Sequence, residues 1–371
     1  MRRAWLLAAC TACTAVDQDL LGPQASACAL GEVGVWVDVT PAEVTQTPPD
    51  PGVRGMALDP FDVSVLYAVT HGQGVWRSPD CGATWTHTNT GINGPVIEGA
   101  YPLDIALDPF VPDTIYTPPR FGGGSVWASY NAGVHWENLL PADVAMPLYN
   151  SDIADLSHLA ALPDAPHHII VTSQVSWIGF GDDAGLLEGR RDDAGTWSWT
   201  VHPPATGMGV AQSIGVIDAR TWLVVSNQFP SGEGTWITRD AGATFTRVDD
   251  HESAGGWQLH RSPDGTLYRP SAHGLLRSSD GAATWVDVFA GLGFGGSQAI
   301  IGDGTTLYVS SAVNDGAEGP RLYSAPEVPG DRGWTITGAP MTASVARFFR
   351  DPLRDVLYAV DFEGIKRIRL R

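Results

Sequence analysis

Residues 74–85 read Gly-Val-Trp-Arg-Ser-Pro-Asp-Cys-Gly-Ala-Thr-Trp, and this stretch decides the fold. Val75 and Trp76 suit a half-buried strand, because β-branched and aromatic side chains pack well on a pleated sheet. The Ser-x-Asp-x-Gly segment that follows predicts a tight turn, in which short polar side chains accept backbone hydrogen bonds and Gly82 permits a positive φ. Trp85 then restarts a strand with an indole large enough to fill the gap between two sheets.

The same turn recurs along the chain, and we call each copy a box turn, defined by the spacing Ser/Thr-x-Asp-x-Gly-x-Thr-Trp/Phe. Copies occupy residues 78–85, 129–136, 238–245 and 278–285, and a fifth copy with a one-residue insertion precedes Trp199. The second copy has Asn131 in place of Asp and His135 in place of Thr, and the fourth has its glycine one place early, at Gly281. The residues predicted to build the five turns are Ser78, Asp80, Gly82, Trp85, Asn131, Gly133, Trp136, Asp193, Gly195, Asp240, Gly242, Phe245, Asp280 and Trp285.

A second pattern recurs seven times: an apolar run, a turn centred on an aspartate, and another apolar run. The seven aspartates are Asp59, Asp108, Asp164, Asp218, Asp264, Asp303 and Asp351. The steps between them are 49, 56, 54, 46, 39 and 48 residues. Repeats of this length, each with four short strands, are typical of β-propeller blades. The 43 glycines and 27 prolines agree with a turn-rich, all-β chain.

The two ends of the chain complete each other. The seventh repeat has its third strand near residues 364–370, where the sequence stops one strand short of a blade. Residues 36–39 (Trp-Val-Asp-Val) match residues 285–288, the strand that follows the fourth box turn. We therefore predict a single seven-bladed β-propeller over residues 33–371, in which the N-terminal strand completes the last blade and removes the exposed sheet edges.

The first residues read as a targeting signal. Residues 1–13 combine a basic start, a short apolar core and Leu-Ala-Ala-Cys at residues 7–10, which resembles the lipobox of bacterial lipoproteins. This predicts a signal peptide with lipidation at Cys10, followed by a tether over residues 14–32. A plain secretion signal and an N-terminus without a targeting role are the alternatives. The prediction places the protein in the bacterial cell envelope or outside the cell, touching membrane only through a lipid anchor.

The predicted pairing of the remaining cysteines depends on the closure of the ring by the N-terminal strand. Cys28 precedes the closing strand, and Cys81 lies in the first box turn, in the adjacent blade. A Cys28–Cys81 disulfide is geometrically possible, and an exported protein permits it. Two unpaired thiols are the alternative, and Cys13 is left without a predicted role.

Charge and motifs exclude several classes of function. The formal net charge is −19, from 41 acidic and 22 basic residues, and Lys366 is the sole lysine. Without a basic face, nucleic acid is not an expected partner. The sequence has no phosphate loop, nucleophile elbow or zinc-ligand spacing. We expect a monomer without a cofactor or metal.

The box turns resemble the Asp-box, or BNR, repeats of a β-propeller superfamily. Three segments closely resemble the repeat sequence of xyloglucan-hydrolysing enzymes: residues 59–60 (Asp-Pro), 66–68 (Leu-Tyr-Ala) and 74–78 (Gly-Val-Trp-Arg-Ser). Sialidases share the turn but carry Arg-Ile-Pro where residues 53–55 read Val-Arg-Gly. The photosystem II assembly-factor family and the luminal domain of sortilin share it as well, and both bind proteins without catalysis.

The resemblance implies that ligands bind on one face of the ring. In this strand order, the box turns lie on one face, here called the box face. The connections between blades and the loops between second and third strands lie on the other, here called the loop face, which opens on the central channel. The binding candidates are Arg54, His158, Trp177, Phe180, His260 and Arg347, with Gln258 and Gln298 also near the channel mouth. Trp177 and Phe180 look exposed and able to stack on a sugar or a partner; the alternative is that they cover their own loop.

Two functions remain open. The leading hypothesis is a non-enzymatic binding or assembly module for a protein or a glycan. The alternative is a glycoside hydrolase, which the resemblance to xyloglucan-hydrolysing enzymes implies. Such enzymes use paired carboxylates and two propellers, whereas one ring is predicted here, and residues 70–72 read Thr-His-Gly where those enzymes carry an acid. The weak catalytic candidates are Asp104, Asp152, Asp155, Asp249 and Asp250.

Overall fold

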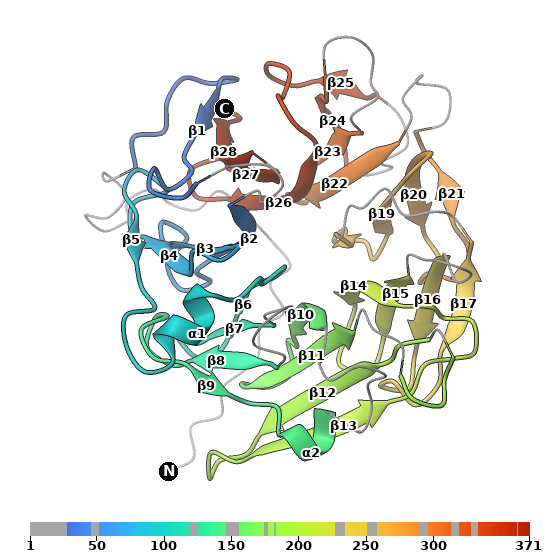
Figure 1. Ribbon diagram of the computed structural model, residues 1–371. Helices are drawn as coiled ribbons and strands as arrows, with labels where there is room; N and C mark the ends of the chain where they lie inside the picture. Colours follow the sequence, from blue (N-terminus) through green and yellow to red (C-terminus); the bar gives the residue numbers. More distant parts are fainter. Residues whose placement is uncertain are drawn as a thin grey trace, which may run out of the picture.

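A computed structural model describes residues 28–45, 52–118, 125–145, 156–173, 177–181, 183–226, 234–250, 258–289, 296–312, 319–327, 333–361 and 363–371. These residues form seven four-stranded antiparallel sheets, arranged as blades in a ring (Figure 1). The predicted seven-bladed propeller is therefore confirmed. Cys10, Cys13, Asp152 and Asp155 lie outside the described residues.

The strands follow one another from the channel outward in each of the first six blades. Blades 1 and 2 comprise β2 (Val53–Leu58), β3 (Leu66–Thr70), β4 (Val75–Ser78), β5 (Thr86–His87), β6 (Ala106–Leu107), β7 (Ile115–Thr117), β8 (Trp127–Ser129) and β9 (Glu137–Asn138). Blades 3 and 4 comprise β10 (Leu156–Ala161), β11 (His168–Ser173), β12 (Leu186–Arg191), β13 (Trp197–His202), β14 (Ala211–Val216), β15 (Trp222–Ser226), β16 (Gly234–Thr238) and β17 (Thr246–Asp249). Blades 5 and 6 comprise β18 (His260–Arg261), β19 (Leu267–Ser271), β20 (Gly274–Ser278), β21 (Val286–Asp287), β22 (Ser297–Gly302), β23 (Thr306–Ser311), β24 (Leu322–Pro326) and β25 (Thr335–Ile336).

Blade 7 joins the two ends of the chain. It comprises β26 (Val345–Asp351), β27 (Val356–Asp361), β28 (Gly364–Arg369) and the N-terminal strand β1 (Trp36–Asp38). Trp36 lies opposite Ile368, and Asp38 lies opposite Lys366. The predicted closure by the N-terminal strand is confirmed, and it pairs the edge that β28 would otherwise expose.

The hydrophobic core lies between neighbouring blades. The second strands β3 and β27 are buried along their whole length, because each blade is covered on both faces by its neighbours. Between blades 7 and 1, Met56 and Leu66 pack with Tyr358 and Ile365. The continuous apolar runs seen in the sequence are therefore the second strands.

The box turns are held by side chains that bond to the backbone. In the first, Gly82 N donates to Ser78 Oγ over 2.8 Å, and Thr84 N donates to Asp80 Oδ1 over 2.8 Å. The turns at residues 238–245 and 278–285 repeat this pattern, and Asn131 takes the place of aspartate in the second copy. Trp85 Nε1 donates to Val39 O of the neighbouring blade over 2.8 Å, so the indole joins blades as predicted.

The fifth copy differs from the prediction. Asp192, not Asp193, accepts the hydrogen bond from Thr196 N, over 2.8 Å. Arg190 stands where the other copies have Ser or Thr, so there is no hydroxyl to bond the turn, and a plain hairpin with Gly195 at φ 87° joins β12 to β13.

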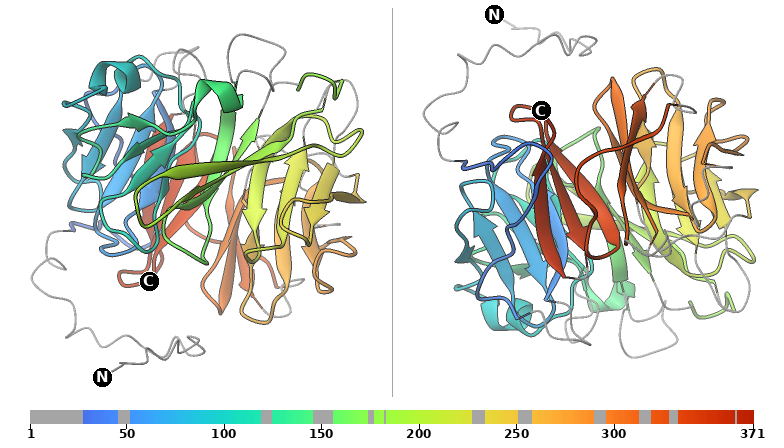
Figure 2. Two further views of the ribbon diagram at one scale, coloured as in Figure 1. Left: turned by 90° about the horizontal axis from the view of Figure 1, so that it is seen from below. Right: turned by 90° about the horizontal axis from the view of Figure 1, so that it is seen from above.

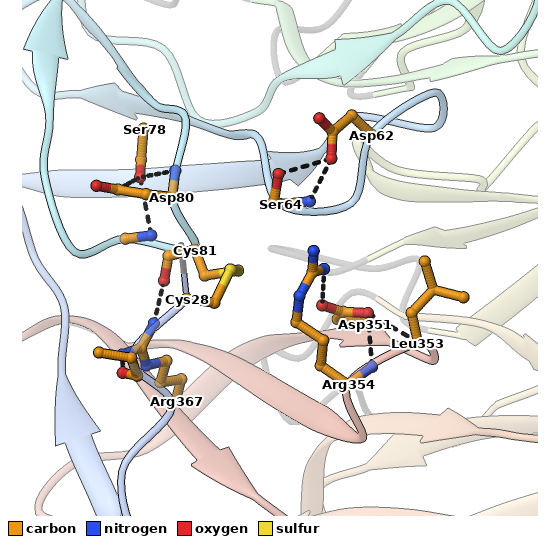
Figure 3. Close-up of a disulfide and its surroundings, with 12 residues drawn as sticks. Cys28, Asp62, Ser64, Ser78, Asp80, Cys81, Asp351, Leu353, Arg354 and Arg367 are labelled. Carbon is orange, nitrogen blue, oxygen red and sulfur yellow. Dashed lines mark hydrogen bonds and ion pairs between the residues drawn. A yellow bond between two sulfur atoms is a disulfide. The ribbon is translucent and has the colours of Figure 1, made fainter. Parts of the chain in front are cut away.

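A disulfide and an arginine reinforce the ring closure. Cys28 and Cys81 are joined by a disulfide, with Cα atoms 5.5 Å apart (Figure 3). Arg367 of β28 donates to Cys81 O over 2.5 Å and also to Ala29 O. The structure thus favours the bridge over two unpaired thiols, and it ties the segment before β1 to the first blade.

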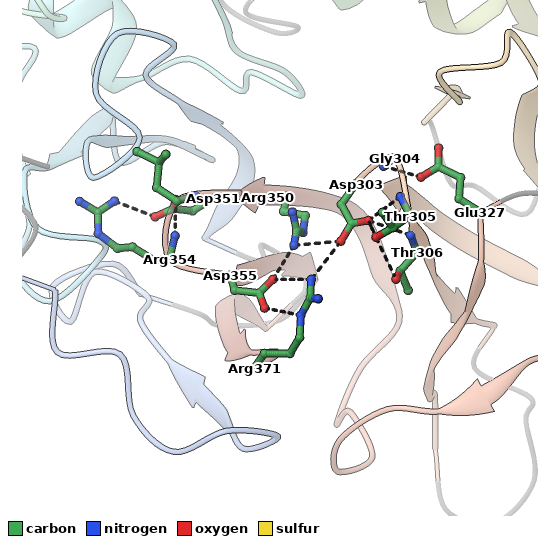
Figure 4. Close-up of polar contacts among 11 residues, drawn as sticks. Asp303, Gly304, Thr305, Thr306, Glu327, Arg350, Asp351, Arg354, Asp355 and Arg371 are labelled. Atoms are coloured by element: carbon green, nitrogen blue, oxygen red, sulfur yellow. Dashed lines mark hydrogen bonds and ion pairs between the residues drawn. The ribbon is translucent and has the colours of Figure 1, made fainter. Parts of the chain in front are cut away.

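Ion pairs join blades 6 and 7 on the box face (Figure 4). Arg350 Nη2 lies 3.0 Å from Asp303 Oδ2 and also pairs with Asp355. Arg371 Nε lies 2.7 Å from Asp355 Oδ2. These contacts bridge the turns between first and second strands of the two blades.

The two faces of the ring are distinct. The helices α1 (Gly94–Glu98) and α2 (Ala142–Ala145) lie on the loop face, and the C-terminus lies on the opposite, box face (Figure 2). Neither helix is long and apolar enough to cross a membrane, and the described residues contain no other candidate for a helical span.

Candidate functional site

Three predicted channel residues meet inside the ring, and we call Asp104, His158 and Arg347 the channel cluster. Asp104 lies two residues before β6 of blade 2, His158 lies on β10 of blade 3, and Arg347 lies on β26 of blade 7. Arg347 Nη1 and Nη2 lie 2.5 and 3.0 Å from Asp104 Oδ1 and Oδ2. His158 Nδ1 lies 3.4 Å from Asp104 Oδ2. Blades 2 and 7 are not neighbours in the ring, so this ion pair crosses the channel.

The Asp104 carboxylate is fully occupied as an acceptor. Besides Arg347 and His158, it accepts the N–H groups of Ile105 over 2.8 Å and Leu159 over 3.2 Å. Burial alone would raise its pKa, but the charge of Arg347 and the hydrogen bonds outweigh burial and lower the pKa of Asp104 to about 2. A buried carboxylate that stays ionised and saturated cannot act as a general acid, and it is a poor base.

A second link crosses the channel beside the first. Gln258 Oε1 accepts Phe348 N over 2.7 Å, and Gln258 Nε2 donates to Phe348 O over 2.5 Å. Gln258 precedes β18 of blade 5, and Phe348 lies on β26 of blade 7, two blades away. The innermost strand of blade 7 is therefore tied to blades 2, 3 and 5 as well as to its neighbours.

The other channel candidates do not all join this cluster. Arg54 lies half-buried on β2, and Gln298 lies half-buried on β22, both on innermost strands. His260 bonds elsewhere: its Nε2 lies 2.7 Å from Oε1 of the buried Glu327, which follows β24 at the box-face end of blade 6. The expectation that His260 lines the channel mouth is therefore wrong, because β18 is short and places the residue near the far end of the strand.

The two aromatic candidates, Trp177 and Phe180, differ in burial. Trp177, expected to be exposed, is fully buried in the core between blades 2 and 3. The indole fits there because residue 185 is glycine, whose absent Cβ would lie 2.7 Å from the ring. Phe180 is 39 % exposed and Ile178 is 55 % exposed, so these two form the apolar tip of the loop. The alternative that Trp177 covers its own loop is the better interpretation.

The acidic candidates are not assembled into a described pair. The side chain of Asp249 is only 5 % exposed and forms an ion pair with the buried Arg269 of the next blade, which indicates a structural role for Asp249. Asp250 beside it is exposed. Asp152 and Asp155 lie outside the described residues.

A buried acid between blades 3 and 4 was not among the residues predicted from the sequence. Glu188 on β12 accepts hydrogen bonds from His168 Nε2 over 2.7 Å and His202 Nε2 over 2.8 Å. Burial would raise the pKa of Glu188, but these bonds and Arg190 lower it well below its usual range. The three residues come from three strands of one sheet, and only their alternation along those strands could have predicted the contact. Across the described residues, no group of three or more His, Cys, Asp or Glu side chains is arranged to hold a metal ion.

Comparison with known proteins places the chain among propellers with differing roles. No known family profile matches it. It is 23 % identical over 280 residues to a xyloglucanase of Paenibacillus sp. and 25 % identical over 276 residues to a xyloglucanase of Hypocrea jecorina. Each alignment covers 64 % of this chain but only 26 % and 33 % of those enzymes. The chain therefore spans about a quarter to a third of the curated relatives it matches.

Solved structures agree on the fold. The GH74 enzyme of Niastella koreensis superposes with a TM-score of 0.62 at 17 % identity, covering 87 % of this chain and 53 % of that one. YCF48 from Cyanidioschyzon merolae superposes with a TM-score of 0.59 at 11 % identity, covering 90 % and 98 %. The extracellular domain of BT3049 from B. thetaiotaomicron gives 0.59 at 11 % identity, covering 87 % and 40 %. At these identities the likeness is one of fold, and the chain is a seven-bladed propeller whose structural neighbours include enzymes and extracellular domains.

Proposed function

We propose that this chain is an exported, non-enzymatic binding module that recognises a protein or a glycan through its loop face. The observation that carries the proposal is the state of Asp104, the candidate acid at the channel. Its carboxylate accepts five hydrogen bonds and stays ionised, so it holds the ring together and is not available for catalysis.

The loop face supplies a surface suited to recognition. Ile178 and Phe180 expose apolar side chains at the tip of the second-to-third-strand loop of blade 3, and Val96 of α1 exposes another on the same face. Exposed apolar side chains on loops that a rigid scaffold positions are typical of binding surfaces. Structural neighbours that are extracellular domains support an exported location.

The alternative function is a glycoside hydrolase. It is supported by the two xyloglucanases among the relatives, although the chain covers a third of their length or less. This alternative requires carboxylates other than Asp104 and Asp249, and among the sequence candidates these are Asp152, Asp155 and Asp250.

A polysaccharide screen distinguishes the two functions. The purified chain is incubated with a panel of soluble glycans, and binding and new reducing ends are measured in the same wells. Binding without cleavage, weakened by Ile178→Ser/Phe180→Ser, supports a binding module. Cleavage that is abolished by an Asp152→Asn, Asp155→Asn or Asp250→Asn change overturns it in favour of the hydrolase. If neither readout responds, crosslinking in the cell envelope should recover a specific protein partner, and failure to recover one contradicts the proposal.

We also propose that residues 1–13 are a signal peptide with lipidation at Cys10 and that a tether follows. The predicted tether over residues 14–32 is corrected at its end, because the Cys28–Cys81 disulfide and the bond from Arg367 to Ala29 O hold residues 28–32 against the ring. The measurement is incorporation of labelled palmitate in a bacterial host. Incorporation lost in Cys10→Ser and kept in Cys13→Ser supports the anchor. A labelled Cys10→Ser protein, or no label in the parent chain, rules it out.

A further inference from the structure

A hollow of about 410 Å³ lies at the outer rim of the ring, away from the channel cluster. It forms where the connection from blade 1 crosses the box turn of blade 2, beside the outermost strand β9. Its volume falls in the range of small-ligand sites. The residues that matter for its chemistry are Ile92, Tyr130, Asn131, His135 and Glu137.

Two of these residues are the departures of blade 2 from the box-turn pattern. In blades 1 and 4 the threonine hydroxyl donates to the second oxygen of the aspartate, as Thr84 Oγ1 does to Asp80 Oδ2 over 2.7 Å. In blade 2 that pair is replaced by His135 and Asn131. Asn131 Oδ1 still accepts from His135 N over 2.9 Å, so the turn keeps its shape without the second bond. Both Asn131 and His135 line the hollow.

The imidazole of His135 is held in one orientation. Its Nδ1 accepts the N–H of Ile92 over 2.9 Å. The ring lies against Gly91, where an added Cβ would approach Nδ1 to 1.9 Å, so only glycine allows this contact. Because Nδ1 is the acceptor, a neutral imidazole carries its proton on Nε2. The exposed His135 thus offers a fixed N–H donor.

An aromatic ring and a carboxylate also line the hollow, from Tyr130 and Glu137. Tyr130 is fixed from behind by Arg191, whose guanidinium lies 4.6 Å from the ring centre, and by Trp197 Nε1, which donates to its hydroxyl over 3.1 Å. Glu137 is exposed and lines the same hollow. Among the lining residues there is one carboxylate and no lysine or arginine.

We propose that this rim hollow binds a neutral pyranose, such as one unit of a neutral polysaccharide. Adjacent sugar hydroxyls both donate and accept, so they match a lining that combines the amide of Asn131 and the imidazole of His135 as donors with the carboxylate of Glu137 as acceptor. The aliphatic Ile92, which is 68 % exposed, and the Tyr130 ring offer apolar contact for the C–H face of a sugar. An anionic sugar is disfavoured by Glu137 and by the net charge of −19. The site is separate from the loop face, so it does not depend on the proposed function.

The test uses methyl glycosides of glucose, galactose and xylose as neutral probes, with methyl glucuronide as the anionic probe, in ligand-observed NMR titrations. A monosaccharide of this size should bind with a dissociation constant on the order of 1–10 mM. The matched variant is Asn131→Asp/His135→Thr, which rebuilds the box turn of blades 1 and 4 and should fold at least as well as the parent. Glu137→Ala, at an exposed position, is the second variant.

The proposal expects at least about tenfold weaker binding of a neutral probe in both variants. It also expects unchanged binding in the loop-face variant Ile178→Ser/Phe180→Ser. That pattern supports a rim site even if the loop face proves to bind nothing. Absence of binding by every neutral probe to the folded parent chain overturns the proposal. So does binding that survives the rebuilt box turn, and so does tighter binding of the glucuronide than of the glucoside.

Discussion

Replacing Asp104 with asparagine should weaken the whole ring, because the change breaks an ion pair that crosses the channel. Asp104 is fully buried, and Arg347 is only 18 % exposed. Asparagine offers one acceptor where the carboxylate served five donors, and it leaves the guanidinium without its counter-charge. Removing one partner of a buried ion pair typically costs about 3–5 kcal/mol of unfolding free energy. We expect Asp104→Asn to fall near the lower end of that range at neutral pH, since Arg347 keeps some contact with solvent.

Part of this loss should depend on pH. The pKa of Asp104 falls from 3.8 to about 2 on folding, mainly because the Arg347 charge overrides the effect of burial. A carboxyl whose pKa is lowered on folding stabilises the fold above its unfolded pKa, and this contribution disappears as the pH falls through the folded value. The shift corresponds to about 2 kcal/mol. The gap between parent and variant should therefore narrow by about that amount between pH 5 and pH 2.

The assay is urea unfolding of the parent chain and Asp104→Asn across this pH range. Comparing the two chains cancels the protonation of every other acid. A matched control is Asp250→Asn, an exposed acid whose change should leave stability within about 0.5 kcal/mol at every pH. A gap between parent and Asp104→Asn of under 1 kcal/mol at neutral pH, or one that does not narrow on acidification, would refute the reasoning.

Three further changes test other parts of the structure. Cys28→Ser should lower unfolding free energy by about 4 kcal/mol in the chain-entropy model, because the bridge spans 53 residues; reductant should lower the melting temperature of the parent and not of the variant. Trp177→Ala should cost about 3–5 kcal/mol whereas Phe180→Ala should cost under about 1 kcal/mol, as measured by denaturant unfolding; equal costs would contradict the buried placement of Trp177. Asp240→Ala should cost about 1 kcal/mol, because it removes the acceptor of Thr244 N and Thr244 Oγ1, and a melting temperature equal to that of the parent would show that the turn does not need the carboxylate.

The fold was predictable because its determinants repeat. Each blade must form a turn between its first two strands, and the spacing of those turns counts the blades without any knowledge of long-range contacts. The closure of blade 7 was also within reach, since residues 36–39 repeat the wording of residues 285–288. The box turns at Asp80, Asp240 and Asp280 follow from local side-chain bonding, which sequence spacing determines.

The candidate site was predictable only in part. The sequence indicated Asp104, His158 and Arg347 one at a time, from their places near the starts of innermost strands. It did not predict that residues 243 positions apart would pair, because that contact depends on how far each strand is inserted toward the channel. The same limit applies to Asp249, whose partner Arg269 belongs to the next blade. The prediction that Trp177 is exposed was wrong for another reason. A loop has no periodicity, so nothing in its sequence distinguishes a buried indole from an exposed one.

The positions where the repeat is broken are therefore more informative about function than those where it is kept. A residue that recurs from blade to blade, such as the box-turn serine or threonine of blades 1, 2, 4 and 5, is explained by the turn that it closes. Asn131 and His135 are not explained in this way, because the aspartate and threonine of the other copies would close the turn with one more hydrogen bond. Blade 2 lacks this bond between the side chains of the turn, and the hollow lies at the same place. A ligand in the hollow would make the polar contacts that the turn lacks. The sequence of this box turn is therefore better explained by binding than by the stability of the turn.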